Sequence, residues 1–291
     1  MAKPRRVLVI GASGQVGKAC LESFARAGWD TVGTYMSKPK AGLVALDLCD
    51  RMAIDHTMIT VKPDMCVVSG ALTNVDKCED EPALANRVNA DAPGAVAEAM
   101  NRLGGRTVFL STEYVFDGTN GPYAEGDPTN PISVYGATKL AGECGVLGVD
   151  SNNLVVRTTV VYSWDPLGMN FIMQLWRRLT SGNQAQVPFD QSSSPTYAPE
   201  LGNAIARVSD DAKGVLHIAG PDVLSRMEFA KIAVEAIGLD PGLLTAVETS
   251  SLKQKAKRPL NAGLKTEKLA GFGVTMSGVR GGIDDLRRRS R

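Results

Sequence analysis

The sequence predicts an α/β protein in which a doubly wound parallel sheet is followed by a smaller C-terminal α/β lobe. Two observations support this fold class. Short apolar runs rich in β-branched residues alternate with segments of helical length over the first half of the chain, and this alternation stops near residue 160. Strands that alternate with helices form βαβ units, which build parallel sheets with right-handed crossovers.

Each expected element of the first half rests on its apolar pattern. Short continuous apolar runs predict buried strands, and apolar residues three or four positions apart predict helices. We expect strands at 6–10, 31–34, 43–46, 65–68, 107–110 and 154–156. We expect helices at 16–27, 52–61, 82–103 and 134–147.

The second half has longer polar stretches between its apolar segments. We expect helices at 171–179, 199–208 and 226–237 and a strand at 215–218. The helix at 226–237 should bury an apolar face made of Phe229, Ile232, Ala233 and Ile237. Segments 181–196 and 241–257 receive no helix or strand assignment, and the basic tail Arg287–Arg291 is typical of a frayed, solvated end.

The change of pattern near residue 160 predicts two units. We expect one domain at 1–160, which also takes in the segment 199–220, and a smaller lobe at 161–291.

Composition excludes several classes of protein. The chain has 291 residues, with 32 basic and 31 acidic side chains and a net charge of +1. This balance argues against a nucleic-acid-binding protein, which is usually strongly basic. His56 and His217 are the only histidines, so we expect no metal site.

The sequence also suggests where the protein resides. No apolar run approaches the roughly 20 residues that span a bilayer. The basic start is followed by only a short apolar run at 7–10, which is too short for a signal peptide. Five scattered cysteines without a CxxC motif indicate free thiols in a reducing compartment. We therefore expect a cytoplasmic protein.

A glycine-rich loop joins the first expected strand to the first expected helix. Gly11 permits the tight turn, Gly14 lets the backbone approach a pyrophosphate, and Gly17 lets the helix pack closely on the sheet. The helix N-terminus offers unpaired N–H groups to the phosphates. This arrangement is typical of Rossmann domains. The expected phosphate-side contacts are Gly11, Ser13, Gly14, Gln15, Val16 and Gly17.

The end of the second strand indicates the cofactor. NAD enzymes usually carry an acid there that binds the ribose 2′-hydroxyl, but the stretch 33–40 contains none and Asp30 lies too early. Ser37 and Lys38 can instead hold a 2′-phosphate, so we favour NADP over NAD for the domain at 1–160. Further expected cofactor contacts are Tyr35, Asp47 and Leu48, with a helix-capping role as the alternative for Asp47.

Tyr135 and Lys139 are the candidate acid–base pair. Their i, i+4 spacing places them on one face of the expected helix at 134–147. A nearby ammonium stabilises a phenolate and lowers the phenol pKa, which suits proton transfer. Ser111 and Thr112 end the strand at 107–110, and we expect one of their hydroxyls to bind the substrate carbonyl oxygen.

Seven segments together resemble the extended short-chain dehydrogenase/reductase superfamily and, more narrowly, the dTDP-4-dehydrorhamnose reductase family. They are 11–17, 71–76, 111–118, 135–143, 194–197, 217–220 and 258–261. The string Ser-Thr-Glu-Tyr-Val-Phe-Asp-Gly at 111–118 is the most specific of them. The resemblance implies catalytic roles for Thr112, Tyr135 and Lys139. It also implies cofactor contacts at Gly70, Ala71, Tyr135 and Lys139, and a sugar site bordered by Thr73, Asn74, Glu113 and Tyr114.

Three positions depart from the family pattern. Glu113 stands where the family usually has Asp, which keeps the charge but changes its reach. Val160 stands where the family often has a Trp that flanks the sugar, so we place Val160 at the substrate site. Ser69 and Gly70 replace an Asn-Ala pair.

The resemblance implies reduction of the keto group of a nucleotide-linked 4-keto-6-deoxy sugar by NADPH. In the C-terminal lobe, Asn170, Tyr197 and Arg258 should hold the nucleotide diphosphate. Two alternatives stay open: a non-catalytic regulatory subunit of the methionine adenosyltransferase β type, and an NAD-dependent nucleotide-sugar epimerase. We expect no nucleic acid or membrane partner, and the sequence leaves room for a homodimer.

Overall fold

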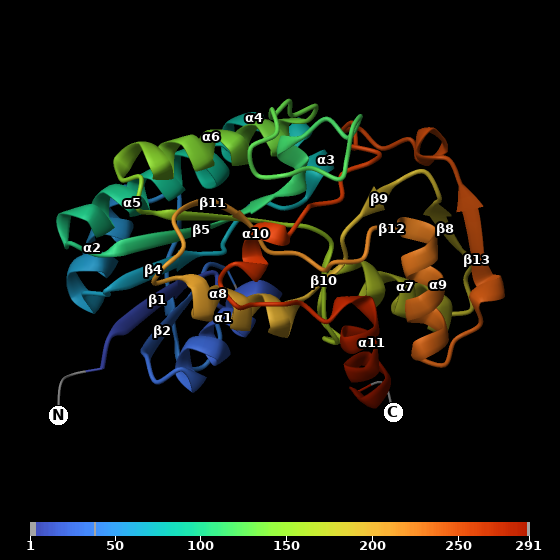
Figure 1. The fold of residues 1–291 in the computed structure, drawn as a ribbon, viewed down its shortest axis with the longest axis horizontal. Coiled ribbons are helices and arrows are strands. Elements are labelled where there is room, and N and C mark those ends of the chain that lie inside the picture. Colours follow the sequence, from blue (N-terminus) through green and yellow to red (C-terminus); the bar gives the residue numbers. More distant parts are fainter. Residues whose placement is uncertain (1–3, 38, 290–291) are drawn as a thin grey trace.

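A computed structural model describes residues 4–37 and 39–289, and it confirms the expected fold class (Figure 1). Within these residues the main sheet has seven parallel strands in the order β11-β6-β5-β4-β1-β2-β3. The strands are β1 (Arg6–Ile10), β2 (Asp30–Tyr35), β3 (Leu43–Ala45), β4 (Met65–Val68), β5 (Arg106–Thr112), β6 (Leu154–Thr158) and β11 (Gly214–His217). The strand order reverses at β1, so the carboxyl ends of β1 and β4 form the switch point where such sheets bind ligands.

Helices cover both faces of the sheet, as Figure 1 shows with α1 and α8 on one side and α2, α5 and α6 on the other. The side chains of β1 alternate between the two cores: Val7 and Val9 point to one, and Leu8 and Ile10 to the other. The covering helices are α1 (Gln15–Arg26), α8 (Ala198–Val208), α2 (Arg51–Val61), α5 (Ala92–Arg102) and α6 (Val134–Val149).

The single helix expected at 82–103 is interrupted. It consists of α4 (Pro82–Asn86), a π-helical turn at Arg87–Asp91, and α5. The turn places the buried Asn89 opposite the loop that follows β4. The Asn89 amide accepts from the N–H of Leu72 at 2.8 Å and donates to the Leu72 carbonyl at 3.1 Å. The Asn89 side chain thus pairs with the backbone of Leu72, which lies beyond the end of the strand β4. We attribute the interruption of the regular α-helix at 87–91 to this buried pairing.

The chain returns to the first lobe after visiting the second. Helix α8 packs beside α1, and β11 pairs with β6 at the sheet edge. Near α10 (Glu267–Ala270), Leu269 and Val274 also join the core on the α1 and α8 face. The segment around α10, although it lies within 161–291, therefore packs with the first lobe, because its apolar side chains cover that core beside β11.

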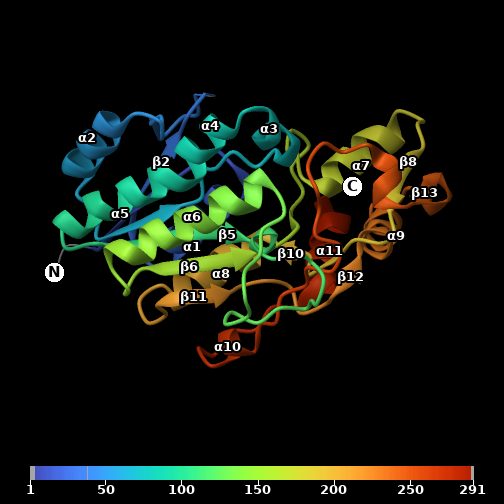
Figure 2. The ribbon, with the colours of Figure 1, turned by 90° about the horizontal axis from the view of Figure 1, so that it is seen from above.

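The second lobe lies beyond the carboxyl edge of the sheet (Figures 1 and 2). Its elements are α7 (Phe171–Thr180), β8 (Ala185–Pro188), β9 (Ser192–Ser193), β12 (Leu224–Ser225), α9 (Arg226–Ala236), β13 (Leu244–Val247) and α11 (Gly278–Arg289). The unassigned stretches 181–196 and 241–257 contain β8 and β13, which pair in parallel. Strands this short depend on a distant partner, so local pattern does not reveal them.

One sequence expectation for this lobe is wrong. Ile232 is 37% exposed, whereas Phe229 and Ala233 are buried as predicted. Helix α9 also buries Ala230 and Val234, so its apolar face is displaced from the predicted one. Residues 287–289 of the basic tail are helical and not frayed, because they continue α11, which buries Val279, Ile283 and Leu286 against the lobe. Arg287 and Arg288 are exposed, as expected for a solvated end, and residues 290–291 lie outside the described residues. The short parallel pair of β7 (Val161–Tyr162) and β10 (Thr196–Tyr197) joins the two lobes.

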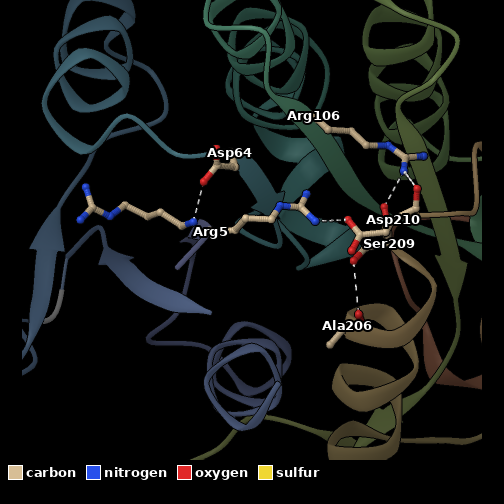
Figure 3. A network of polar contacts seen from close by, with 7 residues as sticks. Arg5, Asp64, Arg106, Ala206, Ser209 and Asp210 are labelled. Carbon is tan, nitrogen blue, oxygen red and sulfur yellow. Dashed lines mark hydrogen bonds and ion pairs between the residues drawn. The ribbon is translucent and has the colours of Figure 1, made fainter. Parts of the chain in front are cut away.

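An arginine network holds the amino edge of the sheet together (Figure 3). Arg106 donates to the carbonyls of Ser209 at 2.5 Å and Asp210 at 2.8 Å, and it also reaches Ala212. These carbonyls follow α8, where a helix end leaves acceptors unpaired. Arg5 pairs with the Asp210 carboxylate at 2.8 Å. The network therefore fixes the end of α8 to β5.

Candidate active site

The glycine loop has the geometry of a phosphate cradle. Gly11 has a φ of +83°, and a Cβ there would lie 2.6 Å from the backbone nitrogen of Gly70. A Cβ at Gly17 would lie 2.2 Å from the Gly11 carbonyl oxygen. Both positions therefore require glycine, whereas Gly14 is less crowded, at 3.3 Å. Helix α1 has no side-chain cap from Gly14 and no acid in its first turn, so its N–H groups fit a pyrophosphate.

The end of β2, where the ribose 2′ contacts are expected, lies beside the cradle. Thr34 accepts a hydrogen bond from the Gly11 N–H at 3.2 Å, so β2 ends beside the cradle. Tyr35 is half-buried there and Ser37 is exposed, while Lys38 lies outside the described residues. Asp30 begins β2 and is held by Arg6 at 2.6 Å. It therefore lies at the opposite edge and cannot serve the ribose.

The expected adenine and nicotinamide contacts flank the cradle. Asp47 is exposed and accepts from the Cys49 N–H at 2.8 Å, so it shapes a turn. The capping role considered for Asp47 is taken by Asp50, which caps α2. Leu48 is buried and reaches within 3.2 Å of a Cβ built at Gly70. Gly70 and Ala71 follow β4 and are half-buried, and Ser13 and Val16 belong to the loop and the first turn of α1.

Thr112 and Tyr135 meet at the carboxyl end of β5. Tyr135 lies in the first turn of α6, whose N-cap is Ser133, and its hydroxyl lies close enough to the Thr112 side chain for Thr112 to lower its pKa. The Tyr135 ring also packs edge-on against Tyr114, with ring centroids 5.4 Å apart. The structure therefore brings two of the three predicted catalytic groups into direct contact.

Lys139 lies one turn further along α6 and is buried. Its ammonium donates to the Leu110 carbonyl at 2.6 Å and lies 4.0 Å from the centroid of the Phe109 ring. Burial lowers the pKa of Lys139 to about 7, and the charge of Glu143 opposes this shift. Lys139 therefore exchanges its proton near neutral pH.

The sequence predicts that Lys139 lowers the pKa of Tyr135, but Lys139 is not among the main groups that shift this pKa in the structure. Burial raises the pKa of Tyr135 above its ordinary value, and the charge of Glu113 raises it further. The hydrogen bond with Thr112 lowers the Tyr135 pKa. Tyr135 is thus a protonated phenol at neutral pH. Lys139 does not lower the Tyr135 pKa below its ordinary value, because its ammonium is directed to the Leu110 carbonyl of the sheet.

Ser111 and Thr112 have separate tasks because successive strand residues face opposite ways. Thr112 faces Tyr135, and it donates to the Glu113 carboxylate at 2.7 Å. Ser111 instead donates at 2.5 Å to Glu143, which forms a buried ion pair with Arg157 at 2.6 Å. Of the two hydroxyls, Ser111 is bound to Glu143 and Thr112 faces Tyr135, so Thr112 is the candidate for the substrate-binding hydroxyl.

Two arginines approach Glu113 and Tyr114 from the C-terminal part of the chain. Glu113 is buried, which raises its carboxyl pKa, while Thr112 and Arg226 oppose the shift. Arg226 begins α9, and its guanidinium lies 4.7 Å from the Phe171 ring centroid. Within the described residues, that guanidinium has no hydrogen-bond or ion-pair partner. Burial lowers the Arg226 pKa, and the charges of Tyr114 and Glu113 oppose this.

Arg258 is tied to the loop after β4. It donates to the Asp76 carboxylate at 3.0 Å and is hydrogen-bonded to Tyr114. Asp76 belongs to α3 (Val75–Asp80), which Asn74 caps by accepting from the Lys77 N–H at 3.0 Å. Thr73 and Asn74 are exposed at the start of this helix. The expected sugar-side residues Thr73 and Asn74 thus lie on a segment that Asn89 holds at Leu72 and Arg258 holds at Asp76.

Three expected substrate residues are engaged elsewhere. The Tyr197 hydroxyl donates to Asp285 of α11, and its ring packs near Tyr162. Asn170 caps α7 and donates to Gln15 at 2.8 Å. Val160 packs with the second lobe and has a φ of +40°, which is rare for a β-branched residue. We therefore leave Tyr197 and Asn170 out of the proposed diphosphate site.

Sequence reasoning missed Arg226 and Asn89. The signal for Arg226 was its position as the first residue of an amphipathic helix, but nothing local shows which way its guanidinium points. Asn89 carried a clearer signal, because an amide within an alanine-rich apolar helix needs a buried partner. Within the described residues, no group of three or more His, Cys, Asp or Glu side chains could hold a metal ion.

Comparison with known proteins places this geometry in a family. A family model described as the RmlD substrate binding domain matches residues 5–286. The dTDP-4-dehydrorhamnose reductase of Mycolicibacterium smegmatis is 34% identical over 276 residues, which cover 93% of this chain and 81% of that protein. The methionine adenosyltransferase 2 subunit beta of Bos taurus is 30% identical over 278 residues, with coverage of 93% and 83%.

A solved structure agrees with these sequence matches. The crystal structure of dTDP-4-dehydrorhamnose reductase from Bacillus anthracis, in complex with NADP, superposes with a TM-score of 0.89 at 27% identity. The match covers 99% of this chain and all of that one. The resemblance predicted from the sequence is confirmed, and the chain belongs to the RmlD substrate binding domain family of extended short-chain dehydrogenases/reductases.

Proposed function

We propose that the protein reduces the keto group of a nucleotide-linked 4-keto-6-deoxy sugar with NADPH. The observation that carries the proposal is the hydroxyl pair of Thr112 and Tyr135 at the same sheet edge as the cradle. Strands β1 and β5 are separated only by β4, so their carboxyl ends face one crevice. The B. anthracis relative was crystallised with NADP, which supports the choice of cofactor.

The chain's own residues supply position and a proton. NADPH, when bound, supplies a hydride to the carbonyl carbon. Thr112 orients the carbonyl oxygen, and Tyr135 gives that oxygen its proton as negative charge develops there. The raised pKa keeps Tyr135 protonated at neutral pH, and an alkoxide is basic enough to take the proton. Lys139, one turn further along α6, is proposed to hold the nicotinamide ribose.

Arg226 and Arg258 are proposed to hold the nucleotide diphosphate. A guanidinium presents paired N–H donors that match phosphate oxygens. Arg226 is the stronger candidate, because it is half-buried and its guanidinium donors are unused within the described residues. Arg258 is already bonded to Asp76 and Tyr114, so it contributes charge from a fixed position. Glu113 and Tyr114 lie between the arginines and the catalytic pair, where a sugar joined to the diphosphate would fit.

A substrate panel tests the proposal directly. Purified protein is mixed with several nucleotide-linked 4-keto-6-deoxy sugars, each with NADPH and with NADH, and nicotinamide absorbance is followed. We expect oxidation that depends on the sugar and is faster with NADPH. Failure of every sugar with both cofactors would refute the reductase proposal.

A regulatory subunit is the second candidate, because the Bos taurus relative is named as a subunit of methionine adenosyltransferase. This role predicts stable co-purification with a methionine adenosyltransferase and no sugar-dependent NADPH oxidation. An epimerase is less well supported, because the stretch after β2 carries no acid for the NAD ribose.

The cellular location and assembly are further proposals. Within the described residues, none of the helices is long and apolar enough to cross a membrane. All five cysteines are free, which supports the proposed cytoplasmic location because reduced thiols persist there. The homodimer stays a prediction, and light scattering on the purified protein would test it.

A further inference from the structure

Gln15 connects the glycine loop to the second lobe. It is the first residue of α1, directly after Gly14, so its backbone belongs to the phosphate cradle. Its side-chain amide donates to the Val161 carbonyl at 2.8 Å. The amide oxygen accepts from the Ser163 hydroxyl at 2.9 Å and from the Asn170 amide at 2.8 Å. The side chain therefore binds the second lobe and not the cradle.

The partners of Gln15 lie where the chain crosses between the lobes. Val160, the residue before β7, has a left-handed backbone, which is unfavourable for a β-branched residue. Such a conformation persists only when its surroundings hold it. The bond from Gln15 to Val161 and the bond from Thr196 to Val160, at 3.2 Å, provide that support.

The contacts continue from Gln15 to the proposed diphosphate site. Asn170 caps α7 by accepting from the Met173 N–H at 3.2 Å. The next residue, Phe171, carries the Arg226 guanidinium on its ring. The placement of Arg226 therefore depends on the start of α7, which is held by Gln15.

We propose that Gln15 is a positioning residue that couples dinucleotide binding at the glycine loop to nucleotide binding by the second lobe. The proposal rests on the proposed function for the identity of the two ligands. A ligand that orders the loop fixes Gln15, Asn170 and Phe171, and so prepares Arg226 for its anion. By linkage, the second ligand must strengthen binding of the first by the same factor.

Binding measurements on the whole chain test the coupling without turnover. The dissociation constant of NADP is measured by calorimetry with and without saturating dTDP as the probe. For the wild type we expect dTDP to tighten NADP binding at least about fivefold, the lower end of typical coupling. In Gln15→Met, which keeps the length but loses the amide, we expect the factor to fall to about one. The factor is a ratio of two dissociation constants measured on the same variant, so a change in the affinity for NADP alone does not enter it.

Two further variants separate coupling from general damage. Asn170→Asp keeps a good cap for α7 but removes the donor to Gln15, so it should lose the same coupling. The double variant should then lose no more coupling than either single variant, because both single variants remove the bond between Gln15 and Asn170. Gln186→Met is the matched control, since Gln186 is exposed on β8, and it should keep the wild-type factor.

Hydrogen exchange gives a readout that needs no ligand. Gln15→Met should speed exchange of the amides at 161–173 relative to wild type and to Gln186→Met. Wild-type coupling and wild-type exchange in Gln15→Met would overturn the proposal. Should the wild-type protein bind neither NADP nor dTDP, the proposed function would fail. The rate of hydrogen exchange at 161–173 would then still show whether Gln15 stabilises the segment that passes between the lobes.

Discussion

The two edges of the main sheet each carry a half-buried arginine, but the two arginines have different partners. Burial lowers the pKa of Arg106 at the amino edge and of Arg226 at the carboxyl edge. Arg106 donates to the carbonyls of Asn152, Ser209 and Asp210. Within the described residues, Arg226 rests on an aromatic ring and has no hydrogen-bond partner.

This difference separates stability from function. A desolvated cation that lacks acceptors weakens the folded state, and a ligand anion can offset that cost. The cation of Arg106 is already satisfied by backbone oxygens, so it contributes to folding. The same contrast predicts which substitutions at each edge change activity and which change stability. The predictions below run from the largest expected effect to the smallest, first for activity and then for stability.

Tyr135→Phe should have the largest effect. It removes the proposed proton donor but keeps the ring contact with Tyr114, so we expect kcat to fall by about 10²- to 10⁴-fold. NADP affinity should change little. The matched control is Tyr162→Phe, because the Tyr162 hydroxyl is also buried but donates to the Val279 carbonyl at 3.3 Å. Wild-type kcat in Tyr135→Phe would rule out its role as the acid.

Arg226→Met should raise the substrate KM by about 10- to 100-fold. This range corresponds to losing about 1.5–3 kcal/mol from hydrogen bonds with a charged group. Because the guanidinium has no acceptor to lose among the described residues, the free energy of unfolding should stay equal or rise. Arg226→Lys keeps the charge but not the paired donors, so its KM should be intermediate. Steady-state kinetics and urea unfolding measure the two quantities.

A loss of stability in Arg226→Met, with KM unchanged, would contradict the comparison. It would mean that Arg226 serves the fold as Arg106 does.

The sequence predicted the parts of the site that depend on local spacing. The loop from Gly11 to Gly17 must follow a strand and open a helix, and the four-residue spacing of Tyr135 and Lys139 shares a helix face by geometry alone. Strand alternation also explains why Ser111 and Thr112 could not be told apart. Choosing between them requires knowing which face of β5 meets α6.

The remainder of the site depends on contacts between distant segments. The direction of Arg226 is set by Phe171 on another helix, and the amide of Asn170 is directed to Gln15, which lies 155 positions earlier. The short pair β8 and β13 forms only because two weak segments meet in the second lobe. The sequence could not predict the lowered pKa of Lys139, because that pKa is set by the burial of Lys139 against the end of the sheet.

Arg106→Met should destabilise the fold without changing KM. It keeps the aliphatic stem but leaves several backbone oxygens near the end of α8 without their donor, so we expect a loss of about 2–4 kcal/mol in the free energy of unfolding. Arg102→Met is the control, because Arg102 forms an exposed ion pair with Asp55, which should contribute no more than about 1 kcal/mol. Urea unfolding compares them. Equal stability of the two variants would show that the network in Figure 3 adds nothing.

Lys139 gives the smallest but most specific effect, a dependence of stability on pH. Its pKa is lowered to about 7 in the folded state, while the unfolded chain keeps the ordinary value near 10.5. Between these values the unfolded chain holds a proton that the folded chain has released, so this group makes stability rise with pH. Below pH 7 both states hold the proton, and the full penalty of a buried cation remains.

The contribution can be isolated with Lys139→Met. A pKa near 7 gives a rise of about 1.4 kcal/mol in the free energy of unfolding between pH 6 and pH 8. Lys139→Met should lack this rise and should be more stable than wild type at pH 6, although it loses activity. Lys18→Met, at an exposed position on α1, should keep the wild-type dependence. A Lys139→Met protein less stable than wild type at pH 6 would mean that the bond to Leu110 outweighs desolvation, and Lys139 would then resemble Arg106 at the opposite edge.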